Sequence, residues 1–192
     1  MGAKEQQLSD EAIIRRFLQT KDNAWFSQLY RRYSGKVYAK CIGMLREEAL
    51  AQDVAQEIFV KLYVSLAKFS ERSKFSTWVY SVTYNYCIDV IRKRKKEQTL
   101  FAEEPDSMPE VIDDVPDELL FQMEVKRLKR VLDEIPVDDK AVLLMKYQDD
   151  LSIKDICEAL GKSESAIKMK IKRAKHKTQR AYERLYAQQP TL

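Results

Sequence analysis

One segment of this chain, residues 97–116, limits how the rest can fold. It has seven acidic residues, no lysine or arginine, and three prolines, namely Pro105, Pro109 and Pro116. Proline blocks a continuous helix, and neighbouring carboxylates repel one another. We therefore expect an acidic, extended and poorly ordered flexible linker here, with one module on each side, residues 1–96 and residues 117–192.

The two flanking modules are basic, although the whole chain has a net charge of only +4. Residues 1–96 hold 18 basic and 10 acidic residues, and residues 117–192 hold 16 and 13. A basic surface attracts a polyanion, whereas the acidic linker would be repelled by it. The charge pattern therefore favours binding to a polyanion through the modules.

The composition favours an all-α protein, because glycine and proline are scarce and good helix formers are common. No apolar run approaches the roughly 20 residues of a membrane span, and the N-terminus has no signal-peptide core. The cysteines and the single His176 show no metal-ligand spacing, so we expect neither a metal nor a cofactor. Three cysteines spaced far apart fit reduced thiols in a cytosol: Cys41, Cys87 and Cys157.

Apolar residues at helical spacing predict a four-helix bundle before the linker. The first three helices are expected at Leu8 to Lys21, with Ser9 or Asp10 as the cap, at Asn23 to Met44, and at residues 46–67. The apolar stripe of the third helix leaves another face of that helix with polar residues and one valine: Asp53, Gln56, Glu57 and Val60.

The fourth helix follows a polar loop, Ser70–Lys74, and runs from Phe75 into a basic segment, Arg92–Lys96. One face is apolar, and a second face can hydrogen-bond bases and phosphates through Thr77, Ser81, Asn85 and Arg92. Tyr80 and Tyr84 lie beside the second face and offer stacking surfaces. Stacking on aromatic side chains in a positive groove holds single-stranded nucleic acid at about 1–3 kcal/mol per base.

A simpler interpretation of this helix is that its aromatic residues belong to the core and its basic segment is a solvated helix end. We adopt that interpretation for Trp78 alone. For the polar face and the basic segment we favour nucleic-acid binding, because charge and hydrogen-bonding groups occur together there.

After the linker, Asp117 to Ile135 is predicted to be one amphipathic helix, stopped by Pro136 and followed by a short apolar helix from Asp138 to Tyr147. Its apolar positions are Leu120, Val125, Leu128, Val131 and Leu132.

The next stretch has the pattern of a helix-turn-helix. Ser152 and Asp155 can form a capping box, Gly161 supplies the turn, and Ser163 can cap a second helix. That second helix turns two isoleucines inward and is otherwise crowded with cations: Lys168, Lys170, Lys172, Arg173, Lys175 and Lys177. An ordinary helical hairpin with a solvated basic helix is the alternative. The caps, the glycine and the basic second helix together favour DNA binding in the major groove.

From about residue 9 to about residue 185 the chain resembles the bacterial RNA polymerase sigma factors of the extracytoplasmic-function (ECF) type. AQDVAQEIFVKLY resembles the helix that binds core polymerase, and FSTWVYSVTYNYCIDVIRKRKK resembles the helix that melts the promoter and reads its minus-ten element. Residues 151–177 resemble the helix-turn-helix that reads the minus-thirty-five element. The chain lacks the long extra regions of housekeeping sigma factors, and we expect no C-terminal extension.

The resemblance implies that Asp53, Gln56 and Glu57 dock on a basic coiled coil of the polymerase clamp, for which an acidic patch is suited. Asn85 matches the position that helps to capture a flipped base, and the loop before the helix matches the segment that receives it. That loop is bulkier and more charged here than the small, glycine-containing loops common in the family. The expected minus-ten contacts are Ser70, Glu71, Arg72, Lys74, Trp78, Ser81, Tyr84, Asn85, Arg92 and Arg94.

In the second module, Ser165, Lys168, Met169 and Arg173 share a helix face that should approach the major groove. Lys175 and Lys177 should instead meet phosphates. The expected minus-thirty-five contacts are Ser163, Ser165, Lys168, Met169, Lys172, Arg173, Lys175 and Lys177.

The resemblance further implies a cytoplasmic protein, without membrane insertion, whose partners are core RNA polymerase, promoter DNA and an anti-sigma factor. It also implies that the acidic linker runs through the polymerase interior. No catalysis is expected. One alternative is a helix-turn-helix regulator that works without polymerase, which would leave the acidic face and the aromatic helix unused. A second is a nucleic-acid enzyme, against which stands the lack of any histidine near Asp53 and Glu57.

Overall fold

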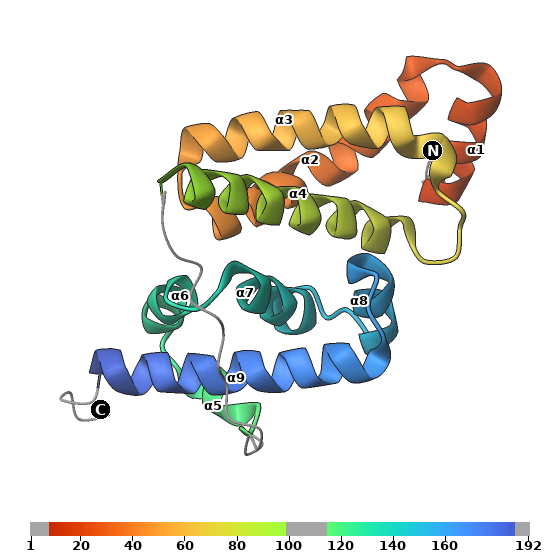
Figure 1. Ribbon diagram of the computed structural model, residues 1–192. Coiled ribbons are helices and arrows are strands. Elements are labelled where there is room, and N and C mark those ends of the chain that lie inside the picture. Colours follow the sequence, from red (N-terminus) through yellow and green to blue (C-terminus); the bar gives the residue numbers. More distant parts are fainter. Residues whose placement is uncertain (1–7, 99–114, 187–192) are drawn as a thin grey trace, which may run out of the picture. The chain divides into compact units, whose positions relative to one another are not determined.

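The computed structural model describes residues 8–98 and 115–186, and every regular element in these two ranges is a helix (Figure 1). The chain divides into two compact units, one ending at Cys87 and the other beginning at Ile88, within helix α4. The predicted all-α fold of two helical modules is confirmed. Our module boundaries stay a prediction, and most of the expected linker, residues 99–114, lies outside the described residues.

The first unit is built from helices that pack around α2. Its elements are α1 (Asp10–Thr20), α2 (Asn23–Leu45), α3 (Glu48–Ser65), the 3₁₀ turn η1 (Leu66–Lys68) and the first part of α4 (Phe75–Gln98). Ser9 and Asp22 cap α1 and α2, because each side chain accepts a hydrogen bond from a backbone N–H of the first turn. Helix α2 packs against both α1 and α3.

Helix α4 is tied to α2 by buried side chains. The thiol of Cys87 donates to the thiol of Cys41 across 3.9 Å, and the ring of Phe75 meets that of Tyr33 edge-on at 5.4 Å. The hydrogen bond between the two thiols lowers the pKa of Cys41 and raises the pKa of Cys87. Both thiols are fully buried, so α4 contributes to the core of this unit as well as to its surface.

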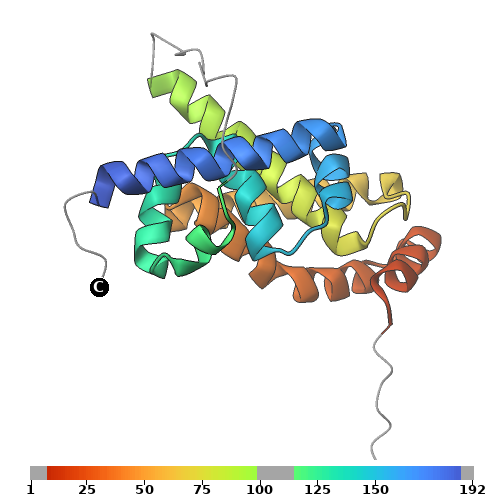
Figure 2. The same cartoon turned by 90° about the horizontal axis from the view of Figure 1, so that it is seen from below.

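The second unit is arranged around one long helix, α9 (Glu164–Tyr186), which packs against α6, α7 and α8 (Figures 1 and 2). Before α9 the chain forms α5 (Glu118–Gln122), α6 (Val125–Asp133), α7 (Val137–Leu143), the π-helical turn η2 (Leu144–Gln148) and α8 (Ile153–Leu160). The apolar stripe of α9 includes Ile167, Ile171, Ala174 and Ala181, all buried. None of the described helices in either unit is long and apolar enough to cross a membrane.

The prediction of a single helix from Asp117 to Ile135 is wrong. The chain leaves the helical conformation at Met123, whose backbone is extended (φ −70°, ψ 133°), and α6 begins two residues later. The break buries the Met123 side chain and leaves Val125 65% exposed, although helical spacing placed Val125 in the core. No proline or glycine lies between Asp117 and Ile135, so the sequence pattern gave no signal for the break.

The turn between α8 and α9 follows the predicted pattern. Ser152 and Asp155 form a reciprocal capping box at the start of α8, and Gly161 ends that helix in the left-handed conformation with φ 61°. The Ser163 hydroxyl accepts a hydrogen bond from the backbone N–H of Ala166 at 3.3 Å, which caps α9. The helix-turn-helix is therefore confirmed in its local geometry.

We predict opposite effects of alanine at two glycines that both have open space where the added methyl group would lie. Gly161→Ala should lower the free energy of unfolding by about 1–2 kcal/mol, because an L-residue is strained in the left-handed conformation. Gly35→Ala, inside α2, should raise it by roughly 0.5–1 kcal/mol, because alanine is the better helix former. Urea unfolding followed by circular dichroism measures both, and equal effects of the two substitutions would contradict the assigned turn.

Candidate nucleic-acid interface

The outer face of α3 carries the predicted acidic patch. Asp53, Gln56 and Glu57 are all exposed, and the neighbouring Val60 is 65% exposed. The hydroxyl of Tyr86 in α4 donates a hydrogen bond to the Glu57 carboxylate at 2.5 Å. One carboxylate of the patch is therefore held in place by the helix that follows, a contact that the sequence pattern did not suggest.

The loop between η1 and α4 is fixed to α1 by Glu71. This residue has a left-handed backbone (φ 56°), and its carboxylate accepts hydrogen bonds from the Arg15 guanidinium at 3.0 and 3.2 Å. The other predicted contacts in this loop, Ser70, Arg72 and Lys74, are all exposed. The loop therefore presents its cations outward, while the carboxylate of Glu71 anchors the loop.

Helix α4 turns part of its predicted minus-ten face to the surface. Asn85, Arg92 and Arg94 lie at or near the surface, and Ser81 is half-buried. Trp78 is also half-buried, and its ring packs against those of Phe69 and Phe75 at centroid distances of 5.6 and 5.7 Å. These contacts agree with our assignment of Trp78 to the aromatic core.

Two residues of α4 that were predicted to lie on or beside its polar face are buried instead. Tyr84 is only 1% exposed and Thr77 only 3%, so neither can offer its side chain to nucleic acid in this structure. The prediction that Tyr84 provides a stacking surface is wrong. Helix α4 meets side chains of both α2 and α3, so its buried arc is wider than the single apolar stripe predicted from the sequence.

Tyr80 is half-buried, and its ring lies against a lysine of α2 to which the sequence analysis assigned no role. The ammonium group of Lys40 in α2 lies 3.9 Å from the centre of the Tyr80 ring and 5.9 Å from that of Tyr84. Lys40 itself is only 7% exposed. A cation over an aromatic face is attracted by the ring quadrupole, most strongly where water is excluded, so Lys40 fixes these rings from beneath.

The N-terminal half of α9 bears most of the predicted minus-thirty-five residues on its surface. Ser163, Ser165, Lys168, Met169 and Arg173 are exposed, and Lys172 is half-buried. The ammonium group of Lys168 lies 2.6 Å from the carboxylate of Glu164, one turn earlier. This hydrogen bond raises the pKa of Lys168 and lowers that of Glu164.

Two lysines of α9 were assigned to phosphate contacts, and the structure places both on the inner side of the helix. Lys175 is 7% exposed, and its ammonium group lies 2.8 Å from Asp117, which lowers the pKa of that carboxyl group. The Lys177 ammonium group lies 2.9 Å from Asp139, and its side chain is 12% exposed. The prediction that Lys175 and Lys177 meet phosphates is therefore wrong for this conformation, because both side chains are largely buried and their ammonium groups are paired with carboxylates of the same unit.

The carboxylates that hold these lysines were missed at the sequence level. Asp117 and Asp139 lie 58 and 38 residues before their lysine partners, beyond the reach of any helical spacing rule. The burial of Asp139 could have been predicted from its spacing. Val142 follows it by three residues and Leu143 by four, so Asp139 lies on the apolar face of α7. An acidic residue in register with core positions needs a buried cation as a partner.

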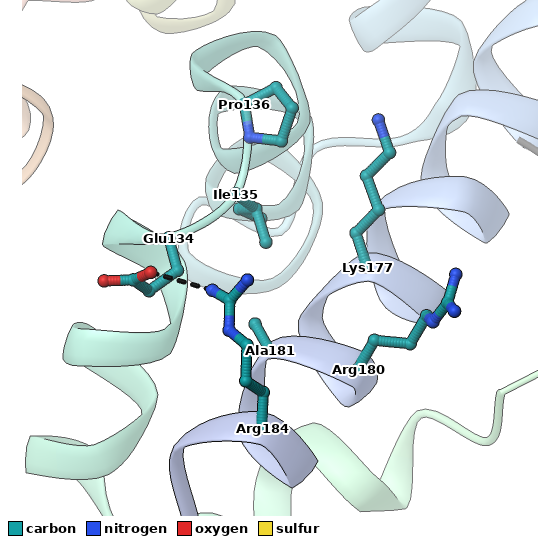
Figure 3. A pocket seen from close by; sticks show the side chains of 7 residues that line it. All are labelled: Glu134, Ile135, Pro136, Lys177, Arg180, Ala181 and Arg184. Carbon is teal, nitrogen blue, oxygen red and sulfur yellow. Dashed lines mark hydrogen bonds and ion pairs between the residues drawn. The ribbon is translucent and has the colours of Figure 1, made fainter. Parts of the chain in front are cut away.

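The second half of α9 lines a pocket of about 450 Å³ beside the turn between α6 and α7 (Figure 3). Its apolar wall is formed by Ile135, Pro136 and Ala181. Arg184 bridges to Glu134 across 2.8 Å, as the dashed line in Figure 3 shows. Beyond Arg173, α9 thus contacts its own unit through several of its basic side chains.

Within the described ranges there is no cluster of three or more histidine, cysteine, aspartate or glutamate side chains that could hold a metal ion. The exposed residues that we predicted to be functional are acidic, cationic and hydrogen-bonding groups of α3, α4 and α9 and of the loop before α4. Those surfaces suit the binding of macromolecules.

Two family descriptions match parts of this chain. The family description Sigma-70 region 2 matches residues 29–97, and Sigma-70, region 4 matches residues 126–177. The chain is 31% identical over 173 residues to the ECF RNA polymerase sigma factor SigW of Bacillus subtilis, covering 85% of this chain and 92% of that protein. It is 27% identical over 158 residues to the sigma factor SigM of the same organism, covering 82% and 94%.

Two solved structures have a similar fold. One is the sigma factor RpoE in complex with the anti-sigma factor NepR from Bartonella quintana, with a TM-score of 0.60, 18% identity, and coverage of 82% of this chain and 96% of that one. The other is CnrH in complex with the cytosolic domain of CnrY, with a TM-score of 0.63, 20% identity, and coverage of 93% and 98%.

Two regions of the sigma-70 type, in this order on an all-helical chain, define a transcription initiation factor. This chain belongs to the ECF RNA polymerase sigma factors, and its function is to direct RNA polymerase to promoters. Proteins of this class are initiation factors rather than catalysts.

Proposed function

We propose that this sigma factor binds core RNA polymerase through the outer face of α3. The observation that carries this proposal is the exposed acidic patch of Asp53, Gln56 and Glu57 on a unit that is otherwise basic. A complementary basic surface on the polymerase would be steered toward this patch and held in register by it. Val60 lies beside the carboxylates and is 65% exposed, so its apolar side chain would be removed from water on binding and would favour the complex.

The loop before α4 and the exposed face of that helix would contact the minus-ten element. Asn85 carries both a donor and an acceptor and can read the edge of an unstacked base. Arg72 and Lys74 can neutralise nearby phosphates, and Arg92 and Arg94 can do so at the other end of the helix. With Tyr84 buried, Tyr80 is the ring of this face that remains partly accessible for stacking.

Promoter melting by this surface needs no covalent chemistry. Unstacking a base costs a few kcal/mol, which stacking on an aromatic ring at about 1–3 kcal/mol per base and phosphate contacts can offset. Binding to the polymerase raises the local concentration of both units at the promoter, so each unit can bind DNA weakly by itself. On this account the protein acts in the cytoplasm, where polymerase and promoter meet.

The exposed side of α9 would enter the major groove of the minus-thirty-five element. Ser165, Lys168, Met169 and Arg173 lie at three- and four-residue steps on that side, and all four are exposed. Arginine can bond two acceptors of a guanine at once, which makes Arg173 the strongest candidate for base reading. A helix-turn-helix regulator that works without polymerase would use the same helix but would leave the acidic patch of α3 without a role.

Charge reversal tests the polymerase contact. Asp53→Lys with Glu57→Lys should weaken core binding by about thirtyfold or more, because opposite charges lost from an interface cost about 2–5 kcal/mol. Helical content should stay the same, because both side chains are exposed. Affinity for fluorescently labelled core polymerase is the measurement.

A matched control is Glu118→Lys with Glu158→Lys, two exposed carboxylates of the second unit. It changes the net charge equally and should leave core affinity close to wild type. If the α3 variant binds core polymerase as well as this control does, the acidic patch is not the docking site.

A second test separates base reading from charge in α9. In the holoenzyme, Arg173→Ala should cost about 1–3 kcal/mol on a matched minus-thirty-five element and relax base preference there. Arg180→Ala removes an exposed charge two turns later on α9 and should weaken matched and scrambled elements alike. Equal losses on both elements for Arg173→Ala would assign Arg173 to the phosphate backbone instead.

We further propose that an anti-sigma factor holds this protein inactive in resting cells. The support is that the two similar solved structures are complexes, one of which is described as a complex with an anti-sigma factor. Exposed apolar side chains available to an amphipathic partner helix include Tyr63, Val64, Phe121 and Val125. Affinity purification from uninduced cells should recover a small helical partner as well as polymerase, and recovery of polymerase subunits alone would speak for control by synthesis.

A further inference from the structure

The most buried carboxylate of the second unit's described residues holds two lysines of α9. Asp139, in α7, is 5% exposed, and both of its oxygens accept hydrogen bonds. One oxygen lies 3.1 Å from the Lys170 ammonium group and the other 2.9 Å from that of Lys177. The two lysines are seven residues apart, so they lie on one face of α9, two turns from each other.

This arrangement divides the lysines of α9 into two sets. Lys168 lies outside, with 63% of its side chain exposed, whereas the side chains of Lys170 and Lys177 are 24% and 12% exposed. All of them belong to one basic segment, and the sequence does not indicate that Lys170 and Lys177 share a buried carboxylate as their partner. The two inner lysines share the carboxylate of Asp139 as a hydrogen-bond partner.

We propose that Asp139 is a positioning and specificity residue for promoter recognition. Its carboxylate keeps Lys170 and Lys177 from contacting DNA and holds α9 against α7. The proposal rests on the proposed function of α9 as the reader of the minus-thirty-five element. Without the carboxylate, each ammonium group would lose a charged partner, which favours its move from the interior to water or phosphate.

The physical reason for a specificity role is the different character of phosphate and base contacts. Each lysine on a phosphate strengthens binding to every sequence and makes it more dependent on salt. Base contacts alone distinguish one promoter from another. Holding two of the α9 lysines on Asp139 therefore lowers sequence-independent binding while the outer residues keep their base contacts.

The first experiment measures lysine reactivity in the wild-type holoenzyme, with and without a matched promoter duplex. Reductive methylation followed by mass spectrometry gives a rate for each lysine. We expect Lys168 to react fast in the free holoenzyme and slowly on DNA, and Lys170 and Lys177 to react slowly in both. Fast reaction of Lys170 and Lys177 before DNA is added would overturn the proposal.

The same data separate this inference from the proposed function. If DNA leaves the rate of Lys168 unchanged, α9 does not approach the promoter, and the specificity role falls together with the function of α9. If Lys168 becomes protected while Lys170 and Lys177 were never slow, the function of α9 stands and only the role of Asp139 fails. Because the chain is wild type, this experiment decides even where a variant does not fold.

The second experiment uses Asp139→Asn in the holoenzyme, on matched and scrambled duplexes over a range of salt. Binding to the scrambled duplex should tighten, and the slope of log K against log salt should steepen by about 0.9 for each lysine that reaches a phosphate. The ratio of matched to scrambled affinity should fall. The contribution of the core enzyme is the same in all holoenzymes and cancels in the comparison.

Two further variants make the result specific. Asp150→Asn changes the net charge equally at an exposed position with φ 51°, where asparagine is tolerated, and should leave the salt slope unchanged. Adding Lys170→Gln and Lys177→Gln to Asp139→Asn should return the slope to the wild-type value. An Asp139→Asn holoenzyme with an unchanged salt slope, or a slope not restored by the two glutamines, would refute the proposal.

Discussion

Each unit of this protein depends on a helix that is buried on one side and exposed on the other, and the exposed side is where we propose contacts with other molecules. Helix α4 buries Tyr84 and Phe75 while it exposes Asn85, and α9 buries Ile167 and Ala174 while it exposes Arg173. Burying apolar area at about 25 cal/mol per Å² favours such a helix in one rotation about its axis only. The rotation that fills the core is therefore the rotation that sets which side chains can meet polymerase or DNA.

Buried polar groups also determine which side chains of these two helices are exposed. In the second unit the groups are charged, and in the first unit the group is a lysine beneath an aromatic ring. Asp139 and Asp117 take lysines out of the exposed face of α9, and Lys40 supports the Tyr80 ring from the interior side of α4. In both cases a largely buried lysine needs a partner within interaction distance, either a carboxylate or an aromatic ring. The exposed faces of α4 and α9 therefore depend on contacts made by largely buried lysines.

The features that the sequence predicted well are those with local causes. The caps at Ser9 and Ser152 and the turn at Gly161 follow from hydrogen bonds and backbone preferences within a few residues. The acidic patch of α3 also follows from spacing, because the patch lies off the apolar stripe that this helix buries.

The failures share a non-local cause. Tyr84 and Thr77 are buried because α4 contacts side chains of two other helices, and Lys175 is buried because Asp117 is brought to it from 58 residues away. The helix break at Met123 likewise has no glycine or proline to announce it. A helical wheel shows which positions share a face, but the width of the buried arc depends on how many neighbours the helix meets.

Helix α1 has a consequence for building hybrid sigma factors. The match to region 2 begins at residue 29, so a hybrid designed from family boundaries would omit α1. Yet Asp10 of α1 accepts hydrogen bonds from Arg32 and Tyr33 of α2. Arg15 of α1 also donates a hydrogen bond to Glu71 in the loop before α4. A transplanted segment cut at residue 29 would carry α4 without the α1 contact that holds the loop before it. The transferable part of this protein therefore begins at the cap of α1, Ser9, well before the point that similarity alone suggests.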